Sequence, residues 1–318
     1  MHFLDPKVEA LESIFKRLSK LIPFKGESMI GILTEGGEKG FAVPQLLKAA
    51  ERKNVKTVVI PMRKLVLGVS ANSPASLGNL NLLDFDALIF RGFNQGSLEE
   101  VILRMDALHR LQRLGMKIYN PPSAIERASD KFYASALLEE AGLPTPRTFV
   151  TEDASEALKI FKQMGDVVVK PLFGSQGKGM TRVTDIETAS RVFENLAFSN
   201  LVIYMQEFVP HGNRDIRAFT IGEEVVAAMY RISDSWKTNV FQGAKPVACK
   251  LEPELEDLSI KAAKVVGCEY AGVDILEGPN GPVIIEVNSS PTWKGLYQAT
   301  KVPIADLLLD YILEKVKQ

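Results

Sequence analysis

The stretch AGVDILEGPNGPVIIEVN, residues 271–288, decides the fold, because two short apolar runs flank a Gly-Pro-Asn-Gly-Pro turn. Side chains two positions apart on a strand share a face, so Glu286 and Asn288 are predicted to project together. Ile285 and Val287 are predicted to enter the core on the opposite face. The pattern favours an antiparallel hairpin whose second strand carries an acid and an amide.

Asp274 lies on the first strand of this hairpin, so three oxygen-bearing side chains are expected to converge on one sheet surface: Asp274, Glu286 and Asn288. Hard divalent cations such as Mg²⁺ prefer oxygen ligands, commonly a few carboxylates together with the phosphates of a nucleotide. Two solvated hairpin carboxylates are the alternative interpretation. A candidate phosphate-binding segment upstream favours the metal site.

The composition is that of a soluble globular protein. The chain has 318 residues, enough for two or three subdomains, with 46% hydrophobic and 24% charged residues. A net charge of -1 offers no general attraction to nucleic acid or to an anionic membrane. No apolar run reaches ~18 residues, so no membrane span is predicted. Cys249 and Cys268 form no disulfide framework, which suits a reducing cytoplasm, and with three histidines a structural zinc site is not expected.

Residues 1–28 are interpreted as a separate helical extension, because apolar residues recur at spacings of four and three. The stripe consists of Leu4, Val8, Leu11, Phe15, Leu18 and Ile22. A helix packed on the body of the chain and a helix that mediates dimerisation are both consistent with this pattern. We expect a homo-oligomer, either a dimer or a tetramer.

Residues 29–121 alternate apolar strands with helices, which predicts a doubly wound α/β subdomain. The expected strands are 30–33, 57–60, 87–90 and 117–119, and the expected helices are 43–53 and 97–114. The glycines of 36–40 lack the spacing of a dinucleotide or Walker loop and are interpreted as a strand-to-helix turn beside a substrate crevice. Asn120-Pro121-Pro122 ends this part, since proline stops helices and central strands.

The rest of the chain mixes strands and helices in an α+β pattern. We expect a central subdomain over 122–203, which begins with a helix at 128–141, and a C-terminal subdomain over 204–318.

The segment VVVKPLFGSQGKGM, residues 167–180, has the composition of a phosphate-binding hairpin. Lys170 ends an apolar strand, and three glycines follow: Gly174, Gly177 and Gly179. Glycine lets backbone N–H groups approach an anion closely, and Lys178 adds a mobile charge at the loop tip. No helix with Lys-Ser/Thr follows, so we predict a flap over nucleotide phosphates rather than a Walker loop. A plain glycine turn beside a strand-end lysine is the alternative.

Further segments support a nucleotide site. The apolar strand 204–209 can offer backbone groups to the edge of an adenine ring. Arg217, in the charged segment 214–217, is a candidate guanidinium facing a developing oxyanion. Lys237 and Asn239 lie in a predicted loop and are candidate phosphate and metal-side donors. A solvated strand edge and an ordinary exposed loop are the alternatives for these charges.

In this order, the segments resemble the ATP-grasp carboxylate–amine ligases, specifically the RimK-type glutamate ligases. The resemblance runs from about Met29 to the C-terminus and rests on Lys131 in ASDKF, the Lys170 strand with its flap, Gln206-Glu207-Phe208, Arg214-Asp215-Ile216-Arg217, Trp236-Lys237-Thr238-Asn239, Asp274 and Glu286-Val287-Asn288-Ser289-Ser290-Pro291. Within that group, the segments 120–122, 227–232 and 289–293 are most similar to tetrahydromethanopterin α-L-glutamate ligases. The resemblance implies an ATP-grasp fold, in which residues 29–121 would be the pre-ATP-grasp subdomain.

The resemblance also implies a role for each matched residue. The nucleotide phosphates would be held by Lys131, Lys170, Gly174, Ser175, Gly177, Lys178, Gly179, Lys237, Thr238 and Asn239. The adenine hinge would consist of Gln206, Glu207 and Phe208, with Val209 also binding the nucleotide, and Asp215 would reach the ribose or its neighbourhood. Two Mg²⁺ ions, for which Mn²⁺ can substitute, would be bound by Asp274, Glu286 and Asn288. Arg217 and Arg231 would face the acyl phosphate and the tetrahedral intermediate.

The implied activity is ATP-dependent addition of L-glutamate to a small-molecule carboxylate through an acyl phosphate, with release of ADP and phosphate. An acceptor similar to tetrahydromethanopterin is expected. A peptide or deazaflavin acceptor and a catalytically silent nucleotide-binding regulatory protein are the alternatives. Many RimK-type enzymes carry His-Arg-Gly-Gly after the asparagine, whereas Val240-Phe241-Gln242-Gly243 follows Asn239 here, which argues against a ribosomal-protein or polyglutamate acceptor.

Three aromatic residues are candidates to stack on a planar acceptor such as a pterin: Phe173, Trp236 and Trp293. Packing in the core is an equally weighted alternative for each of them.

Overall fold

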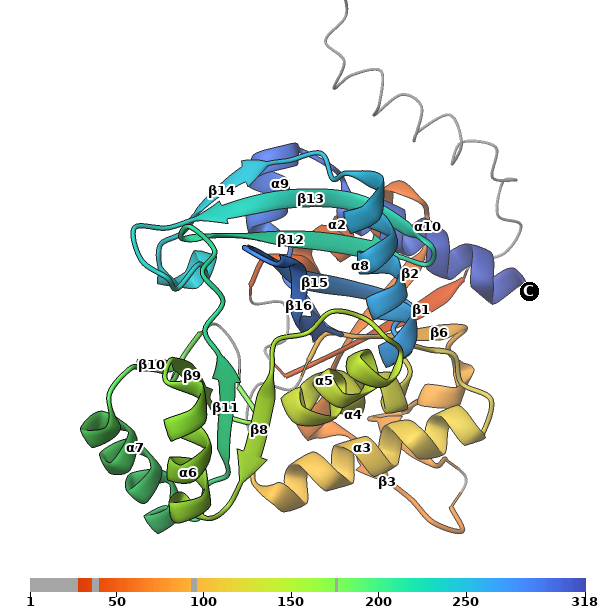
Figure 1. Cartoon of the computed structure of the whole chain (residues 1–318). Helices are drawn as coiled ribbons and strands as arrows, with labels where there is room; N and C mark the ends of the chain where they lie inside the picture. Colours follow the sequence, from red (N-terminus) through yellow and green to blue (C-terminus); the bar gives the residue numbers. More distant parts are fainter. Residues whose placement is uncertain (1–27, 36–39, 72, 93–95, 175–176) are drawn as a thin grey trace, which may run out of the picture. The chain divides into compact units, whose positions relative to one another are not determined.

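The computed structural model describes residues 28–35, 40–71, 73–92, 96–174 and 177–318 (Figure 1). The predicted helical extension over 1–28 falls almost wholly outside these residues. The chain divides into two compact units, one formed by Met1–Tyr119 with Lys301–Gln318 and the other by Asn120–Thr300. The C-terminal segment therefore belongs to the same unit as the N-terminal part of the chain. The four-part division expected from the sequence stays a prediction.

The first unit contains a parallel sheet in the order β2-β1-β6-β7, which confirms the predicted α/β character. Its strands are β1 (Met29–Thr34), β2 (Lys56–Pro61), β6 (Ala87–Phe90) and β7 (Ile118–Tyr119). Its described helices are α2 (Ala42–Arg52), α3 (Leu98–Arg113) and α10 (Ile304–Lys317), with 3-10 turns η1 (Met62–Lys64) and η2 (Leu82–Asp84). A small antiparallel sheet comprises β3 (Val66–Leu67), β4 (Ala75–Leu77) and β5 (Leu80–Asn81).

A local sequence signal explains where α3 begins, and long-range ion pairs hold α10. Ser97 and Glu100 form a reciprocal capping box at the start of α3, and such a cap stabilises a helix by about 1 kcal/mol. Ion pairs join α2 to α10, from Arg52 to Asp306 and from Lys53 to Asp310, each at 2.7 Å. These contacts place residues more than 250 positions apart in one unit.

The second unit contains two sheets, and the smaller one has the order β10-β9-β11-β8. Its strands are β8 (Thr148–Thr151), β9 (Val167–Lys170), β10 (Thr181–Val183) and β11 (Ile203–Glu207). Helices α6 (Ala154–Met164) and α7 (Ile186–Phe198) lie side by side against it, and Phe161 and Phe193 pack edge-to-face in the shared core (Figure 1). Strands β9 and β10 are antiparallel, so the glycine-rich segment between them is a hairpin loop as predicted.

The larger sheet is antiparallel, in the order β14-β13-β12-β15-β16. Its strands are β12 (Arg214–Ile221), β13 (Glu224–Ile232), β14 (Lys245–Ala248), β15 (Tyr270–Gly278) and β16 (Gly281–Asn288). The remaining described helices of this unit are α4 (Pro122–Ser129), α5 (Lys131–Glu140), α8 (Pro253–Val266) and α9 (Lys294–Thr300), with the 3-10 turn η3 (Val240–Gln242).

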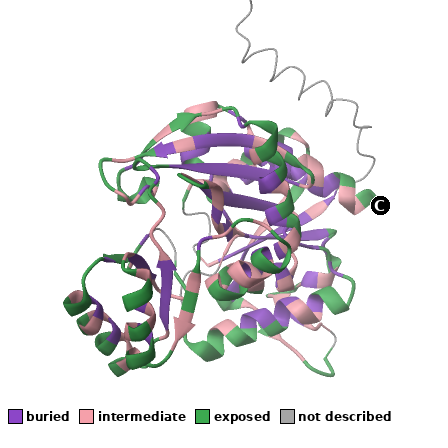
Figure 2. Cartoon of the chain, viewed as in Figure 1, coloured by how far each residue is buried: buried purple, intermediate pink, exposed green. Residues whose placement is uncertain are grey.

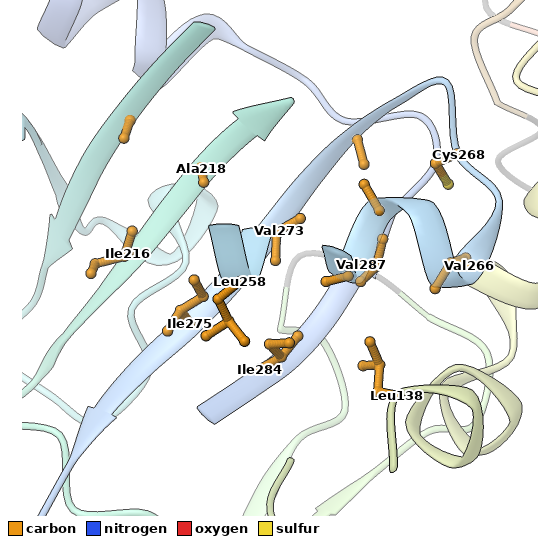
Figure 3. Packing of buried hydrophobic residues seen from close by; sticks show 14 of the residues in the cluster. Leu138, Ile216, Ala218, Leu258, Val266, Cys268, Val273, Ile275, Ile284 and Val287 are labelled. Carbon is orange, nitrogen blue, oxygen red and sulfur yellow. The ribbon is translucent and has the colours of Figure 1, made fainter. Parts of the chain in front are cut away.

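Helix α8 covers one face of this sheet, and Figure 3 shows Leu258 and Val266 among the inward side chains of three strands. The central strands β12 and β15 are almost continuously buried, as Figure 2 also shows. Val273 and Ile284 are 0% exposed within this core. A rigid, well-packed sheet therefore carries the acidic residues predicted to bind metal.

Two local predictions are corrected by the structure. The single helix expected over 128–141 is two helices, because Asp130 interrupts it and caps α5 by accepting from the amides of Phe132 and Tyr133. Ile285 was expected in the core, but a bulge in the β15–β16 pairing shifts the register and turns Ile285 into a cavity, while Ile284 is buried.

Candidate active site

An open cavity of about 840 Å³ lies within the second unit. It is lined by Lys131, Pro146, Val168, Lys170, Pro171, Gly174, Gly177, Lys178, Met180, Gln206, Glu207, Phe208, Val209, His211, Asp215, Arg231, Trp236, Lys237, Thr238, Asn239, Asp274, Leu276, Ile285 and Glu286. Most of the predicted site residues are thus brought together. Gly179, Arg217 and Asn288 do not line the cavity, and Ser175 lies outside the described residues.

Two lysines enter the cavity from different elements. Lys131 is the first residue of α5, and its Nζ donates to the carbonyls of Leu172 at 3.3 Å and Gly174 at 3.0 Å. Lys170 ends β9 and donates from Nζ to Oε1 of Gln206 at 2.5 Å. Burial lowers the pKa of Lys131 and lowers that of Lys170 to about 8. A bound polyanion would relieve this cost, so the site favours phosphate groups.

The predicted adenine hinge spans the end of β11. Glu207 is fixed by Arg147, whose amide and Nε donate to its carboxylate at 3.0 and 2.8 Å. The guanidinium of Arg182 lies 3.4 Å from the ring centroid of Phe208 and also binds Asp166. Among the described residues, no hydrogen bond uses the amide of Val209, which lies at the cavity wall. A free amide beside apolar walls suits the edge of a planar heterocycle.

The candidate metal ligands come from the β15–β16 hairpin, as predicted. Asp274 and Glu286 are direct cross-strand partners, and Asn288 pairs with Gly272. Among the described residues, no hydrogen bond or ion pair engages the carboxylate of Glu286. The amide Nδ2 of Asn288 donates to the carbonyl of Gly272 at 3.3 Å, and its Oδ1 accepts no hydrogen bond from the described residues. Two carboxylates and an amide oxygen are the hard ligands that Mg²⁺ prefers, so the donor set fits this ion.

Asp274 is 1% exposed and is held by two arginines. Arg217 binds it through Nε and, at 2.8 Å, through Nη2, and Arg231 binds it through Nη2 at 3.0 Å. Burial alone would raise the pKa of this carboxyl, but Arg217 and Arg231 outweigh burial and hold the pKa below its ordinary value. Asp274 therefore stays ionised. In the described part of the chain, no group of three or more His, Cys, Asp or Glu side chains is placed to hold a metal ion, so a site here would depend on Asn288 as well.

The loop after β13 closes one side of the cavity. Thr238 donates its hydroxyl to Asp215 at 2.6 Å, and Nζ of Lys237 lies 5.3 Å from the ring centroid of Trp236. Gly177 has a φ of +69°, which favours glycine, and a Cβ there would also displace the side chain of Asn239. The predicted phosphate-end residue Asn239 therefore contacts the flap at Gly177.

The three aromatic candidates have different environments. Trp293 is 1% exposed and packs edge-to-face on Phe219, so it is a core residue. Trp236 lines the cavity and packs edge-to-face on Phe208, while Phe173 is 66% exposed. All three aromatic residues lie beside strand ends in the sequence, so only their positions in the fold distinguish the core residue from the residues that are accessible to a ligand.

His211 and Ile285 are cavity residues that the sequence reasoning missed. His211 follows the hinge, is 8% exposed and has Nδ1 3.1 Å from the carbonyl oxygen of Arg214. A carbonyl can only accept, so Nδ1 carries the proton in this contact. The position of His211 four residues after hinge residue Glu207 was the available signal.

Comparisons with known proteins agree with this geometry. Residues 128–312 match the family model of the RimK-like ATP-grasp domain. The chain is 38% identical over 294 residues to a tetrahydromethanopterin:alpha-L-glutamate ligase of Methanococcus maripaludis, a match that covers 91% of this chain and 99% of that protein. It is 37% identical over 295 residues to the ligase of the same name from Methanocaldococcus jannaschii, again covering 91% and 99%.

Solved structures show the same fold. The ATP-grasp ligase PsnB complexed with minimal precursor superposes with a TM-score of 0.74 at 20% identity, covering 91% of this chain and 100% of that chain. PsnB has also been solved with a phosphomimetic variant of its minimal precursor, Mg and ADP, and that chain superposes with a TM-score of 0.71 at 21% identity, with coverages of 92% and 100%. Together, the family match and the near full-length relatives show that the chain belongs to the RimK-like ATP-grasp family of ligases.

Proposed function

We propose that this protein joins L-glutamate to the carboxylate of a tetrahydropterin-type acceptor, with ATP converted to ADP and phosphate. The observation that carries the proposal is the 38% identity to a tetrahydromethanopterin:alpha-L-glutamate ligase over 99% of that relative's length. ATP-grasp ligases use ATP and Mg²⁺, and the cavity is lined by two carboxylates that suit Mg²⁺, those of Asp274 and Glu286, and by lysines that suit phosphate.

The nucleotide would lie with its adenine at the hinge and its phosphates between the two lysines. The free Val209 amide supports adenine binding at the end of β11. Lys131 and Lys170 supply positive charge from two elements, and both lose hydration in the cavity, which strengthens their attraction to phosphate. The glycine flap, with Gly174, Gly177, Lys178 and Gly179, would cover the phosphate chain.

Asp274, Glu286 and Asn288 would hold two Mg²⁺ ions, and Mn²⁺, which accepts the same ligands, would substitute. Mg²⁺ would neutralise the charge of the transferred phosphoryl group. Glu286 is the most available ligand because its carboxylate has no partner among the described residues. Asp274 has one acceptor position left on Oδ1, since its two oxygens already accept three N–H groups.

The chemistry requires activation of a poor electrophile. The acceptor carboxylate attacks the γ-phosphorus, the bond to the β,γ-bridging oxygen breaks, and an acyl phosphate and ADP result. The glutamate amine then attacks the acyl carbon, loses a proton and expels phosphate. Arg217 and Arg231 are the fixed cations nearest to Asp274, and Arg231 lines the cavity, so it would stabilise the oxyanion more directly.

Measurement of ADP release by the purified protein tests the proposal. Mg-ATP and L-glutamate are supplied with and without a tetrahydropterin carboxylate, and the mass of the acceptor is measured by mass spectrometry before and after the reaction. ADP release that requires the pterin, with a gain of one glutamyl unit, is expected. Release only with a peptide or deazaflavin acceptor would contradict the assigned acceptor, and ATP binding without turnover on any acceptor would contradict the ligase activity. The expected dimer or tetramer is tested on the same sample by light scattering.

A further inference from the structure

The side chain of Asp215 is occupied by protein groups rather than left open to a ligand. It is 1% exposed, and its carboxylate accepts from Nε and Nη2 of Arg231 at 2.6 and 2.5 Å. The hydroxyl of Thr238 donates to the same carboxylate at 2.6 Å. Three of its roughly four acceptor positions are thus filled. A buried carboxylate in this state has little capacity left for two ribose hydroxyls.

The same contacts determine where Arg231 points. Asp215 and Arg231 are direct cross-strand partners on β12 and β13, which sets the pair side by side. A guanidinium has five N–H donors in a fixed plane, and Asp215 binds two of them as a fork. A third donor, on Nη2, reaches Asp274 at 3.0 Å. The orientation of the arginine plane is therefore fixed from two sides.

The remaining edge of this guanidinium is not engaged by the described protein groups. Arg231 is 4% exposed and lines the cavity, yet among the described residues no hydrogen bond or ion pair uses its Nη1. Nη1 carries two N–H groups in the plane that Asp215 and Asp274 define. A buried cation with two unused donors suits a phosphoryl or acyl oxygen in the cavity.

We infer that Asp215 is a positioning residue: with Thr238 it aims Nη1 of Arg231 at the transferred phosphoryl group, and it does not bind the ribose. This inference rests on the proposed function, because it assumes that ATP occupies the cavity. Asp215, which the resemblance places at the ribose, is thus assigned to the orientation of Arg231.

Equilibrium binding tests the inference without any acceptor or glutamate. Trp236 lies at the cavity wall, so tryptophan fluorescence reports binding of Mg-ATP, Mg-ADP and Mg-2′-deoxy-ATP. The readout is the ratio of ADP to ATP dissociation constants, which isolates the γ-phosphate. The variants are Asp215→Asn, Arg231→Lys and the double variant, and circular dichroism confirms that each is folded.

We expect each single variant to lower the preference for ATP over ADP by roughly tenfold, because one charge-assisted hydrogen-bonded fork is lost. The double variant should lose little more than the worse single variant, since both changes remove one arrangement. The ratio between ATP and 2′-deoxy-ATP should be the same in Asp215→Asn as in the unchanged protein. Thr238→Val should reduce the preference for ATP in the same direction, and Thr238→Ser, which restores the hydroxyl, should recover it.

Three outcomes would overturn the inference. Losses that multiply to about a hundredfold in the double variant would mean that Asp215 and Arg231 act independently. If Asp215→Asn kept the full preference for ATP over ADP, or if the unchanged protein had no such preference, then Asp215 would not orient a cation that binds the γ-phosphate. Loss of discrimination against 2′-deoxy-ATP in Asp215→Asn would show that Asp215 binds the ribose. If the variants showed the expected changes in nucleotide binding but the unchanged protein turned over no acceptor, only the proposed ligase activity would be contradicted.

Discussion

Replacement of Lys170 by methionine should change how the stability of the protein depends on pH. Lys170 ends a buried strand, and its Nζ donates to Gln206, which in turn donates from Nε2 to Thr148 at 3.0 Å and to Tyr204 at 3.2 Å. No carboxylate pairs with the ammonium within 4 Å in the described structure. The free protein therefore carries a cation whose hydration is lost and only partly replaced.

The sign and size follow from the pKa of Lys170, which burial lowers from 10.5 to about 8 although Glu286 opposes the effect. Protonation is less favourable in the folded protein than in the unfolded chain, so the unfolded state binds more protons across this window and stability rises with pH. At 1.36 kcal/mol per pKa unit, the cost of the charge is about 3.4 kcal/mol at low pH. About 2.5 kcal/mol of it is recovered between roughly pH 7 and pH 10.

Urea unfolding of the ligand-free protein across that pH range measures this effect. The stability of Lys170→Met relative to the unchanged protein should decrease by about 2.5 kcal/mol from about pH 7 to pH 10, because only the unchanged protein regains stability. Lys170→Arg, which stays charged throughout, is the matched control and should show the same missing slope. Parallel curves for the unchanged protein and Lys170→Met would refute the reasoning.

Three further perturbations separate structural from chemical roles. Glu286→Gln should lower the free energy of unfolding by about 1 kcal/mol or less, because its carboxylate has no hydrogen-bond or ion-pair partner among the described residues and acts on Lys131 and Lys170 only through longer-range attraction. It should weaken Mg²⁺-dependent ATP binding at least about tenfold by calorimetry; a stable variant with intact Mg²⁺ dependence contradicts the metal assignment. Asp274→Asn should instead cost about 3–5 kcal/mol in urea unfolding, because two buried guanidiniums lose their counter-charge; an equally stable variant contradicts the buried ion network. Gly272→Ala should destabilise by about 1–3 kcal/mol, because its Cβ would lie 2.8 Å from Cβ of Pro291 and 2.9 Å from Nη1 of Arg217. In an Arg217→Ala background, part of that cost should disappear, and full additivity would show that the arginine is not the obstacle.

Local patterns anticipated much of the fold. The β15–β16 hairpin was predicted because apolar runs flank a turn of glycine and proline, and both signals lie within 18 residues. The β9 strand with its glycine hairpin was predicted because an apolar run ends at Lys170 and three glycines follow it. The helix over 128–141 was wrong at its start, because Asp130 was interpreted as part of a helix that it in fact caps.

Contacts between distant segments could not be predicted in the same way. The side chain of Asn120 is 0% exposed, accepts from the amides of Glu269 and Tyr270, and donates to the carbonyls of Tyr270 and Ser289. No spacing rule relates residues about 150 positions apart. The bulge that turns Ile285 into the cavity likewise depends on the register with β15, which only the paired sheet defines.

The sequence by itself therefore determined the types of residues available to the site: two lysines, a hinge, and an Asp, Glu and Asn on one hairpin. These are properties of strands and turns, whose periods and turn residues act over a few positions. The tertiary structure alone decided which charges neutralise one another. Antiparallel pairing of β12 with β13 and β15 gave Arg231 to Asp215 and Arg217 to Asp274, because cross-strand register, and not distance along the chain, sets which buried charges meet.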